Sequence, residues 1–307
     1  MCNTCYTGCY TQSSTPYHQV ACGLQPGLPR DKATGRALSA QVLRLPRLQR
    51  DSKARLESYL KTFPLQPDLR QITSLSLTPF ERDINDLRAC YWIRELFCHT
   101  CDTLKKLVID IPLRTCLPQQ DLLGVRPVLR EAFEKLVNLE EFIAVKDELP
   151  LDLYHGERAF VWRCWPKLKR MALGGASCDS TFWQQVALHP SLSTLVVREP
   201  DEMPTCDPKS EHLRHTDRPL RFVILTTPSW RVEGVDYYWV CDWITLDPTD
   251  NMSISEYLLP YCLEKDGSMR NAARRRQEFI RNAAEDGSLW NWQGKQILHT
   301  LQSALSL

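Results

Sequence analysis

A triplet of apolar residues recurs along the middle of the chain, and its internal spacing predicts a short strand each time. The unit is an apolar residue, two variable positions, an apolar residue, one variable position and a third apolar residue. The last two members alternate with a period of two, as side chains on a strand do. The six units are Ile72/Leu75/Leu77, Leu104/Leu107/Ile109, Leu139/Phe142/Ala144, Leu168/Met171/Leu173, Leu192/Leu195/Val197 and Leu220/Val223/Leu225. Their first members are 32, 35, 29, 24 and 28 residues apart.

Helical periodicity separates these strand patterns. Two apolar faces with helical spacing consist of Ile84, Leu87, Trp92 or Ile93, and Leu96, and then of Leu122, Val125, Val128, Leu129 and Phe133. A third, shorter helix holds Phe182 and Trp183, and Asp179 or Ser180 can cap its N-terminus. A strand followed by a helix, repeated every 24 to 35 residues, is typical of a leucine-rich-repeat solenoid.

An ordinary doubly wound α/β sheet is the alternative, because it also alternates strands with helices. The nearest approach to its phosphate-binding loop is Leu173-Gly174-Gly175-Ala176-Ser177. We interpret this stretch as a tight turn, since a backbone cradle for phosphate needs more than two glycines. The predicted fold is therefore α/β, an irregular leucine-rich-repeat-like solenoid of short parallel strands backed by helices.

The pattern also predicts how the chain is divided. Residues 1–36 are predicted to form a disordered tail rich in Cys, Ser and Thr. They show no apolar periodicity, so they cannot bury enough apolar surface to offset the conformational entropy lost on ordering. Residues 37–71 form a helical N-terminal cap, and residues 72–226 form the solenoid. Residues 227–307 form an α+β cap that contains an aromatic run, Tyr237 to Trp243, and a helix from Asn271 to Ala284. Such a cap is needed because a solenoid leaves its last repeat open.

Composition adds limits on partners and compartment. The 307 residues are 43% hydrophobic and carry a net charge of +1, so the chain as a whole has no attraction for nucleic acid or acidic lipid. No apolar run is long enough to span a membrane, and the first residues do not resemble a secretory signal. Thirteen cysteines, an odd number in a long chain, indicate a reducing compartment, cytoplasmic or nuclear.

The side chains between the triplet members are predicted to face the concave side of the solenoid. The central column is Ser76, Val108, Ile143, Ala172, Val196 and Ile224. The preceding column is Ser74, Lys106, Glu141, Arg170, Thr194 and Phe222, and the following one is Thr78, Asp110, Val145, Gly174, Arg198 and Thr226. An apolar stripe flanked by polar groups is typical of a protein-binding surface.

We therefore predict that a protein substrate or partner binds a monomer of this chain on that stripe. The predicted contact residues are Lys106, Val108, Asp110, Glu141, Ile143, Val145, Arg170, Val196, Arg198, Phe222 and Ile224. The alternative is that the C-terminal aromatic segment folds over the stripe and buries it.

Metal binding has two candidate clusters of cysteine. Cys2, Cys5, Cys9 and Cys22 lie near His18, and Cys98-His99-x-Cys101 could form a second chelate. Zinc needs four ligands in a tetrahedron, and neither cluster offers the paired spacing of a zinc site. We interpret the first as part of the tail and the second as an ordinary loop, and we expect no metal and no cofactor.

An enzymatic role finds support only in scattered residues. His212-x-x-His215 on a helix would place two imidazoles on one face, with His155 and Cys206 elsewhere in the chain. No third ligand accompanies them, and the serine-hydrolase, P-loop and kinase motifs are absent. Residues 200–219 read as a polar loop. A metal-dependent hydrolase therefore stays an alternative, and we expect no catalytic residues and no enzyme.

Nucleic-acid binding is a third possibility. Arg270 and Arg274–Arg276 precede Trp290 and Trp292, and basic residues beside aromatic rings can bind single strands. Nearby acidic residues, among them Glu278 and Glu285, dilute this charge. We expect no nucleic-acid partner.

Several stretches resemble a family of fungal F-box proteins with degenerate leucine-rich repeats. They are Leu104–Asp110, Leu123–Arg130, Phe133–Phe142, Trp165–Leu173 with Phe182-Trp183, and Asp286–Trp292. The resemblance covers roughly residues 52 to 300, and its most particular parts are the tail and the Trp165 stretch.

The resemblance implies the substrate-recognition part of a cullin-type ubiquitin ligase. In that family an N-terminal F-box of three helices docks on a Skp1-like adaptor, and the repeats hold the substrate. Here Leu45-Pro46 and Leu56 to Leu60 are the only F-box-like features, and the first strand begins at Ile72. The F-box is therefore truncated or absent, and residues 37–71 are either a helical cap or an F-box remnant. A repeat scaffold that has lost its ligase role is the alternative.

Overall fold

The computed structural model describes residues 42–44, 57–58, 61, 71–80, 84–151, 160–200, 206–227, 246–260 and 269–297. Ser39–Leu307 forms one compact unit, and everything below concerns this unit. The predicted tail, its cysteine cluster with His18, His155 and the aromatic run Tyr237 to Trp243 lie outside the described residues.

Nine strands in the described residues form one open sheet in sequential order. They are β1 (Val42–Arg44), β2 (Ser74–Leu77), β3 (Lys106–Ile109), β4 (Glu141–Ala144), β5 (Arg170–Gly174), β6 (Thr194–Arg198), β7 (Leu220–Thr226), β8 (Met252–Leu258) and β9 (Lys295–Gln296). Strands β1 to β8 are parallel, and β9 pairs with β8 in the antiparallel sense. The doubly wound alternative is wrong, because its strand order would reverse within the sheet.

The six predicted strands are confirmed as β2 to β7. One further strand, β1, lies within the segment that was expected to be helical, and it extends the sheet beyond β2 by parallel pairing. The structure is thus an α/β protein with a mostly parallel, open sheet.

Helices lie between successive strands. They are α2 (Leu87–Thr100), α3 (Val125–Glu134), α4 (Ser180–Leu188) and α5 (Pro208–Leu213), with 3-10 turns at Leu113–Thr115, Pro118–Gln120 and Val161–Cys164. Asp179 caps α4 as predicted, accepting a hydrogen bond from the Phe182 amide at 2.9 Å. Leu122 was placed on the face of α3, but the helix begins only at Val125 and Leu122 is 91% exposed. The short α5 occupies part of the predicted loop at 200–219.

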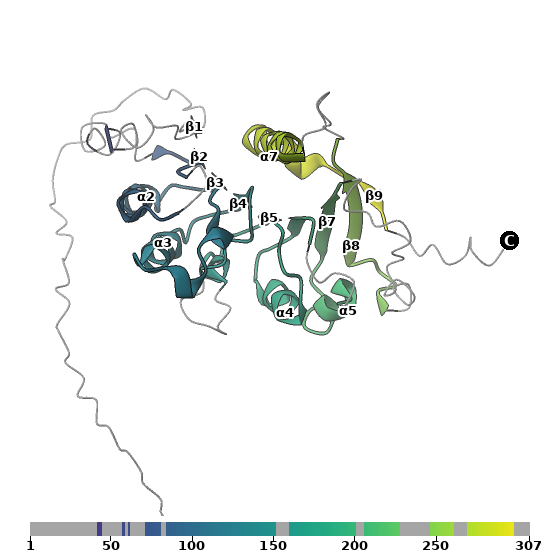
Figure 1. Ribbon diagram of the computed structural model, residues 1–307. Coiled ribbons are helices and arrows are strands. Elements are labelled where there is room, and N and C mark those ends of the chain that lie inside the picture. The colour runs from purple at the N-terminus through teal and green to yellow at the C-terminus, as the bar shows by residue number, and fades with distance from the viewer. Residues whose placement is uncertain are drawn as a thin grey trace, which may run out of the picture. The chain divides into compact units, whose positions relative to one another are not determined.

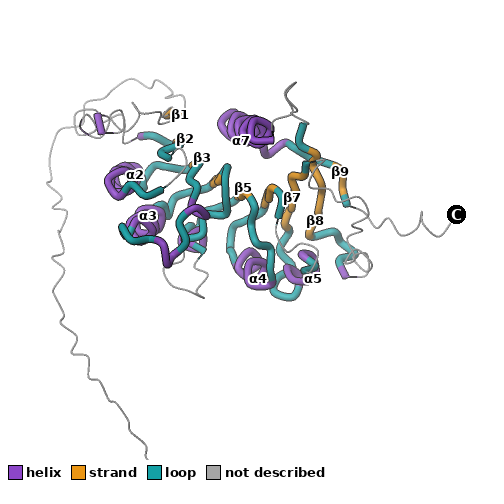
Figure 2. The backbone as a smooth tube through the Cα atoms, in the orientation of Figure 1, coloured by secondary structure: helices purple, strands orange, loops and turns teal. Residues whose placement is uncertain are grey.

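The main core lies between the sheet and these four helices, which Figures 1 and 2 show on one side of the strands. The first member of each central triplet is fully buried there: Leu104, Leu139, Leu168 and Leu192. Phe133 connects the layers, with its ring centroid 5.1 Å from Phe97 and 6.4 Å from both Phe142 and Trp165. Aromatic pairs at these distances stabilise a core beyond their buried area.

A second, smaller core lies on the other face of the sheet. There the helix α7 (Met269–Asp286) and the 3-10 turn η7 (Ser288–Asn291) pack on side chains of the strands. Gly287, with φ of 85°, joins them in the left-handed conformation that glycine adopts without strain, which confirms the predicted helix end. Figure 1 shows α7 on the side of the strands opposite α2 to α5.

The predicted orientation of β7 is wrong by one residue. Its register pairs Leu195 with Phe222 and Val196 with Val223. Phe222 and Ile224 therefore belong to the main core and cannot contact a partner on the opposite face. The strand is apolar on both faces, so its alternation does not show which side chains point where.

Candidate interaction face of the sheet

We call the sheet surface beneath α7 the covered face, and three columns of side chains build it. Because the strands are parallel and in register, equivalent residues of neighbouring strands lie side by side. The first column is Ser74, Lys106, Glu141, Arg170, Thr194 and Arg221; the central one is Ser76, Val108, Ile143, Ala172, Val196 and Val223. Asp110, Val145, Gly174, Arg198 and Leu225 follow them at the carboxyl ends of the strands. The columns agree with the sequence prediction in every strand but β7.

The covered face is not open to solvent. Val108, Ile143 and Val196 are at most 2% exposed, and Val145 is 1% exposed. Ile280, Ala283, Ala284, Leu289 and Trp290 pack on them. The expectation of a free apolar stripe is therefore wrong. Within the described residues α7 and η7 cover it, whereas the aromatic run from Tyr237 to Trp243 lies outside them.

Three aromatic rings hold the end of this cover. Trp292 stacks on Tyr257 at a centroid distance of 4.6 Å and on Phe279 at 5.2 Å. Trp290 is 7% exposed. Both tryptophans thus make contacts within the fold, Trp290 in the second core and Trp292 with two neighbouring rings.

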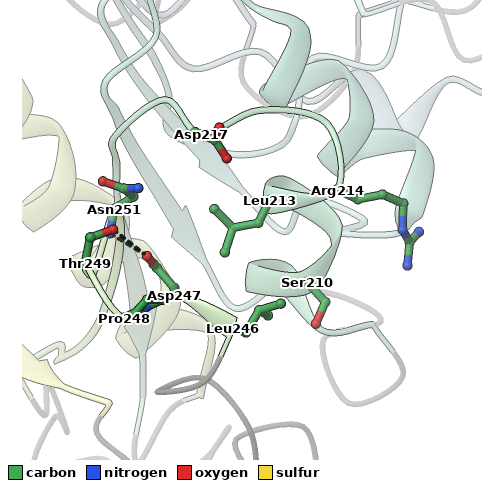
Figure 3. A pocket seen from close by; sticks show the side chains of 9 residues that line it. All are labelled: Ser210, Leu213, Arg214, Asp217, Leu246, Asp247, Pro248, Thr249 and Asn251. Atoms are coloured by element: carbon green, nitrogen blue, oxygen red, sulfur yellow. Dashed lines mark hydrogen bonds between the residues drawn. The ribbon is translucent and has the colours of Figure 1, made fainter.

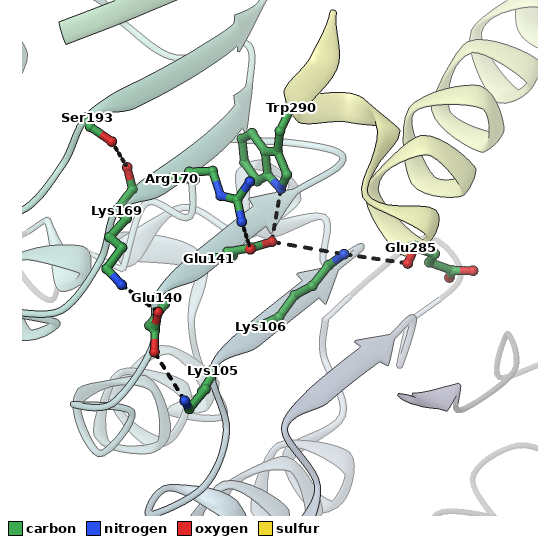
Figure 4. A network of polar contacts seen from close by, with 9 residues as sticks. All are labelled: Lys105, Lys106, Glu140, Glu141, Lys169, Arg170, Ser193, Glu285 and Trp290. Atoms are coloured by element: carbon green, nitrogen blue, oxygen red, sulfur yellow. Dashed lines mark hydrogen bonds and ion pairs between the residues drawn. The ribbon is translucent and has the colours of Figure 1, made fainter. Parts of the chain in front are cut away.

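Glu141 is the centre of the polar contacts in the first column (Figure 4). Its carboxylate accepts a hydrogen bond from Trp290 Nε1 at 2.9 Å and pairs with Arg170, whose guanidinium lies 5.4 Å from the Trp290 ring centroid. Lys106 Nζ lies 4.0 Å from the same carboxylate and 3.5 Å from the Glu285 carbonyl oxygen. Burial lowers the pKa of Lys106, against the attraction of Glu141. Three predicted contact residues, Lys106, Glu141 and Arg170, thus bind the cover.

Asp110 anchors α7 at the carboxyl end of β3. It is 3% exposed and pairs with Arg281 of α7 and, at 3.2 Å, with Lys146. Arg281 is itself 8% exposed. The sequence pattern gave this arginine no role, whereas the structure makes it the partner of a buried acid. Its position one residue after the apolar Ile280 was the only signal of this role.

Arg221 is a second residue that sequence reasoning missed. Its guanidinium donates to the carbonyl oxygens of Trp290, at 2.8 Å, and of Trp292. It belongs to the first column only because β7 is shifted by one residue. The correct register of that strand would have identified it.

A second row of charges lies beside the covered face and is exposed. Glu140 lies 3.5 Å from Lys105 and 2.8 Å from Lys169, and both lysine side chains are about 60% exposed (Figure 4). Pairs as exposed as these contribute little to stability. Lys105 and Lys169 therefore provide matched controls for their neighbours Lys106 and Arg170.

Protein groups fill the space beside Gly174 and Gly175, where a phosphate would have to bind. A side chain at Gly174 would meet the Lys146 carbonyl oxygen at 2.6 Å, and Gly175 has a φ of 59°. The Glu148 carboxylate accepts the Ser177 amide at 2.8 Å, where a phosphate loop would hold its anion, and it pairs with Arg114. Gly174 is the last residue of β5 and Gly175 forms a bend, so the structure shows a bend after the strand at this position. Arg198, another predicted contact, donates to the Lys146 carbonyl oxygen at 3.0 Å beside it.

Asp147, on the same edge, predicts a pH dependence of stability. Burial raises its pKa from 3.8 to about 6, although it accepts amides from Arg114 and Leu149. The folded state therefore binds the proton more tightly than the unfolded state, so this contribution is full below pH 4 and is lost as the pH rises through 6. At 1.36 kcal/mol per pKa unit, the loss amounts to about 3 kcal/mol.

Urea unfolding of the wild type and of Asp147→Asn between pH 4 and 7 measures this effect. The free energy of unfolding of the wild type, relative to that of the variant, is expected to fall as the pH rises. Burial lowers the pKa of His189 and His212, which act in the opposite direction, but they occur in both proteins and cancel in the difference. A difference that stays constant over this range would contradict the prediction.

The histidine pair considered as a metal site is split by the structure. His212 is buried, and its Nε2 lies 3.1 Å from the Arg218 carbonyl oxygen, whereas His215 is exposed beyond the end of α5. Burial raises the pKa of the Cys206 thiol to about 11, so it is protonated at neutral pH. In the described parts of the chain, no three His, Cys, Asp or Glu side chains are placed to hold a metal.

The cysteines of the second candidate metal site, Cys98 and Cys101, contact each other through a local hydrogen bond. Cys101, at the C-terminal end of α2, donates from its thiol to the Cys98 carbonyl oxygen at 3.4 Å. Burial raises the pKa of both thiols. A thiol that stays protonated is a poor ligand, since metals bind the thiolate.

A pocket of about 540 Å³ lies away from the covered face, beside α5 (Figure 3). Its lining residues are Ser210, Leu213, Arg214, Asp217, Leu246, Asp247, Pro248, Thr249 and Asn251. Its most buried acid, Asp247, accepts the amides of Asn251 and Met252 at 2.8 and 2.9 Å and pairs with the buried Lys209 at 3.1 Å. These contacts hold the loop before β8 together, so Asp247 has a structural role in the pocket wall.

Comparison with known proteins finds no relative: no family model, no curated protein and no solved structure matches this chain. Within the described residues, none of the helices combines the length and the apolar character that a membrane crossing requires.

Proposed function

We propose that this chain is a protein–protein interaction module built as an irregular leucine-rich-repeat-like solenoid with a C-terminal cap. The observation that carries the proposal is the register of β2 to β7, which aligns equivalent side chains in columns on one face. Repeat proteins use such aligned surfaces to bind extended partners. The module resembles the substrate-recognition part of an F-box ubiquitin-ligase receptor, and no catalytic role is proposed.

The partner is proposed to bind at the rim of the covered face, where side chains remain accessible beside α7 and η7. Arg170 is the most accessible of the predicted contacts there, because its side chain is 41% exposed although it pairs with Glu141. Arginine beside an aromatic ring, here Trp290, is a combination enriched at protein interfaces.

A repeat scaffold without ligase function is the second candidate, and β1 favours it. Val42–Arg44 pairs with β2 as a further parallel strand. This segment includes the residues just before Leu45-Pro46, where an F-box would begin. Because β1 and β2 are neighbours in the sheet, residues 45–73 connect two adjacent strands, which does not suit a separate three-helix F-box.

Affinity capture with the full chain tests the proposal. Arg170→Ala is expected to lower the recovery of a specific partner at least ten-fold, because it removes the exposed cation of the first column. Lys169→Ala, the adjacent exposed cation outside that column, is expected to leave recovery unchanged. Equal sets of proteins from both variants and the wild type would overturn the proposed face.

Direct binding of a purified Skp1-like adaptor to the full chain separates the two candidates. Binding at micromolar adaptor would support the ligase receptor. Absence of binding, together with a partner that depends on Arg170, would support the scaffold.

A further inference from the structure

We propose that the covered face is a receptor for an amphipathic helix, and that α7 is its resident occupant, which a partner helix of the same pattern displaces. The inference rests on the proposed function, since it names the class of partner. Docking of a helix by its apolar face is one of the common modes of peptide recognition.

The first step of the argument is that the two cores are separate. The main core joins the sheet to α2 to α5 and includes no residue of α7. The second core consists of strand side chains together with Leu259, α7 and η7. Because the sheet lies between them, α7 can leave the covered face without opening the main core.

The second step is that the C-terminal part of α7 and the following η7 are held at three defined points. Arg281 binds Asp110, Glu285 accepts the Ser76 hydroxyl at 2.6 Å, and Trp290 donates to Glu141. Arg281 and Glu285 are four residues apart and thus lie on neighbouring turns of one helical face. These contacts reach three strands, β2, β3 and β4, so they fix the register of the bound helix.

The third step concerns the apolar side chains by which α7 packs on the sheet. Ile280, Ala283 and Ala284 are the buried α7 side chains of the second core, and two of these three are small; the partly buried Phe279 packs against them. A helix that presents small residues can approach the sheet closely while gaining little apolar area. Its ion pairs then determine register and selectivity more than affinity, which suits an exchangeable contact.

The partner is therefore a helix of stated chemistry. It carries an aliphatic residue followed by arginine, a small residue three positions after that arginine, and an acid one position later, as in Ile280-Arg281 and Ala284-Glu285. The arginine would reach Asp110 and the acid would reach Ser76.

The probe is a fluorescent peptide of residues 275–292, added to the full chain. Arg281→Asp in the chain places two acids together at Asp110 and unseats the resident helix. The native peptide is expected to bind this variant at least ten-fold more tightly than the wild type, because the competing helix no longer occupies the face. A peptide that itself carries R281D is expected not to bind the variant.

Charge exchange supplies the controls. The chain with Asp110→Arg is expected to bind the R281D peptide and to reject the native one, and the double variant D110R/R281D is expected to return to wild-type behaviour. Arg274→Asp changes an arginine of the same helix whose side chain is 61% exposed, and it should not increase peptide affinity. Circular dichroism establishes that each variant is folded.

The inference is overturned if the wild type and the R281D chain bind the native peptide equally. It is also overturned if the folded R281D chain does not bind the native peptide and the folded D110R chain does not bind the R281D peptide. Either result would make α7 a permanent part of the fold. The result is independent of the capture experiment. If the peptide fails while an Arg170-dependent partner is found, the exchange of α7 is wrong and the proposed function stands.

Discussion

Replacing Trp165 with alanine is expected to lower the free energy of unfolding by about 4 kcal/mol, the usual cost of removing a large aromatic side chain from a core. Trp165 is fully buried, its ring centroid lies 4.8 Å from that of Phe142, and its Nε1 donates to the Phe133 carbonyl oxygen at 2.8 Å. The side chain thus joins β4, α3 and the turn before β5. Urea unfolding followed by circular dichroism measures the loss.

The phenylalanine variants separate packing from hydrogen bonding. Trp165→Phe retains most of the ring and is expected to cost about 2 kcal/mol, part of it because the Phe133 carbonyl oxygen loses its donor. Trp162 is equally buried, but its Nε1 has no hydrogen-bond acceptor among the described residues. Trp162→Phe should therefore cost less than Trp165→Phe. The reverse order would show that the hydrogen bond does not account for the difference.

The sequence predicted the strands best where one face of the sheet is strongly apolar. In β3 to β6 the triplet members lie in the main core, and the residues between them form the predicted columns. In β7 both faces are apolar, so the pattern located the strand but not its orientation. The three residues of β1 are too few to establish an alternation, and the strand was missed.

The cover of the sheet was harder to predict than the sheet itself. The helix of α7 was visible from its periodicity and from Gly287, but the face that it would bury was not. Its contacts join residues far apart in sequence, 171 positions for Arg281 with Asp110 and 149 for Trp290 with Glu141. Local pattern contains no information on such pairs, so the open stripe and its buried alternative could not be separated before the structure.

Replacing Asp110 with alanine is expected to lower the free energy of unfolding by about 4 kcal/mol, because removing one member of a buried ion pair leaves the other charge uncompensated. Asp110 and Arg281 are both at most 8% exposed. Arg274→Ala, which removes an exposed partner 3.9 Å from Glu278, is expected to cost less than about 0.5 kcal/mol. Urea unfolding of both variants gives the comparison.

The double variant Asp110→Leu with Arg281→Met distinguishes stability from exchange. An apolar pair of similar volume commonly matches or exceeds a buried ion pair in stability, so this protein should regain most of the loss. If α7 is an exchangeable occupant, the same variant should bind the native peptide more weakly than the wild type, because the peptide's arginine would face leucine while the resident helix keeps its contact. A loss below about 1 kcal/mol for Asp110→Ala would mean that the pair behaves as a surface contact. The charges of α7 would then fix its register without holding it in place.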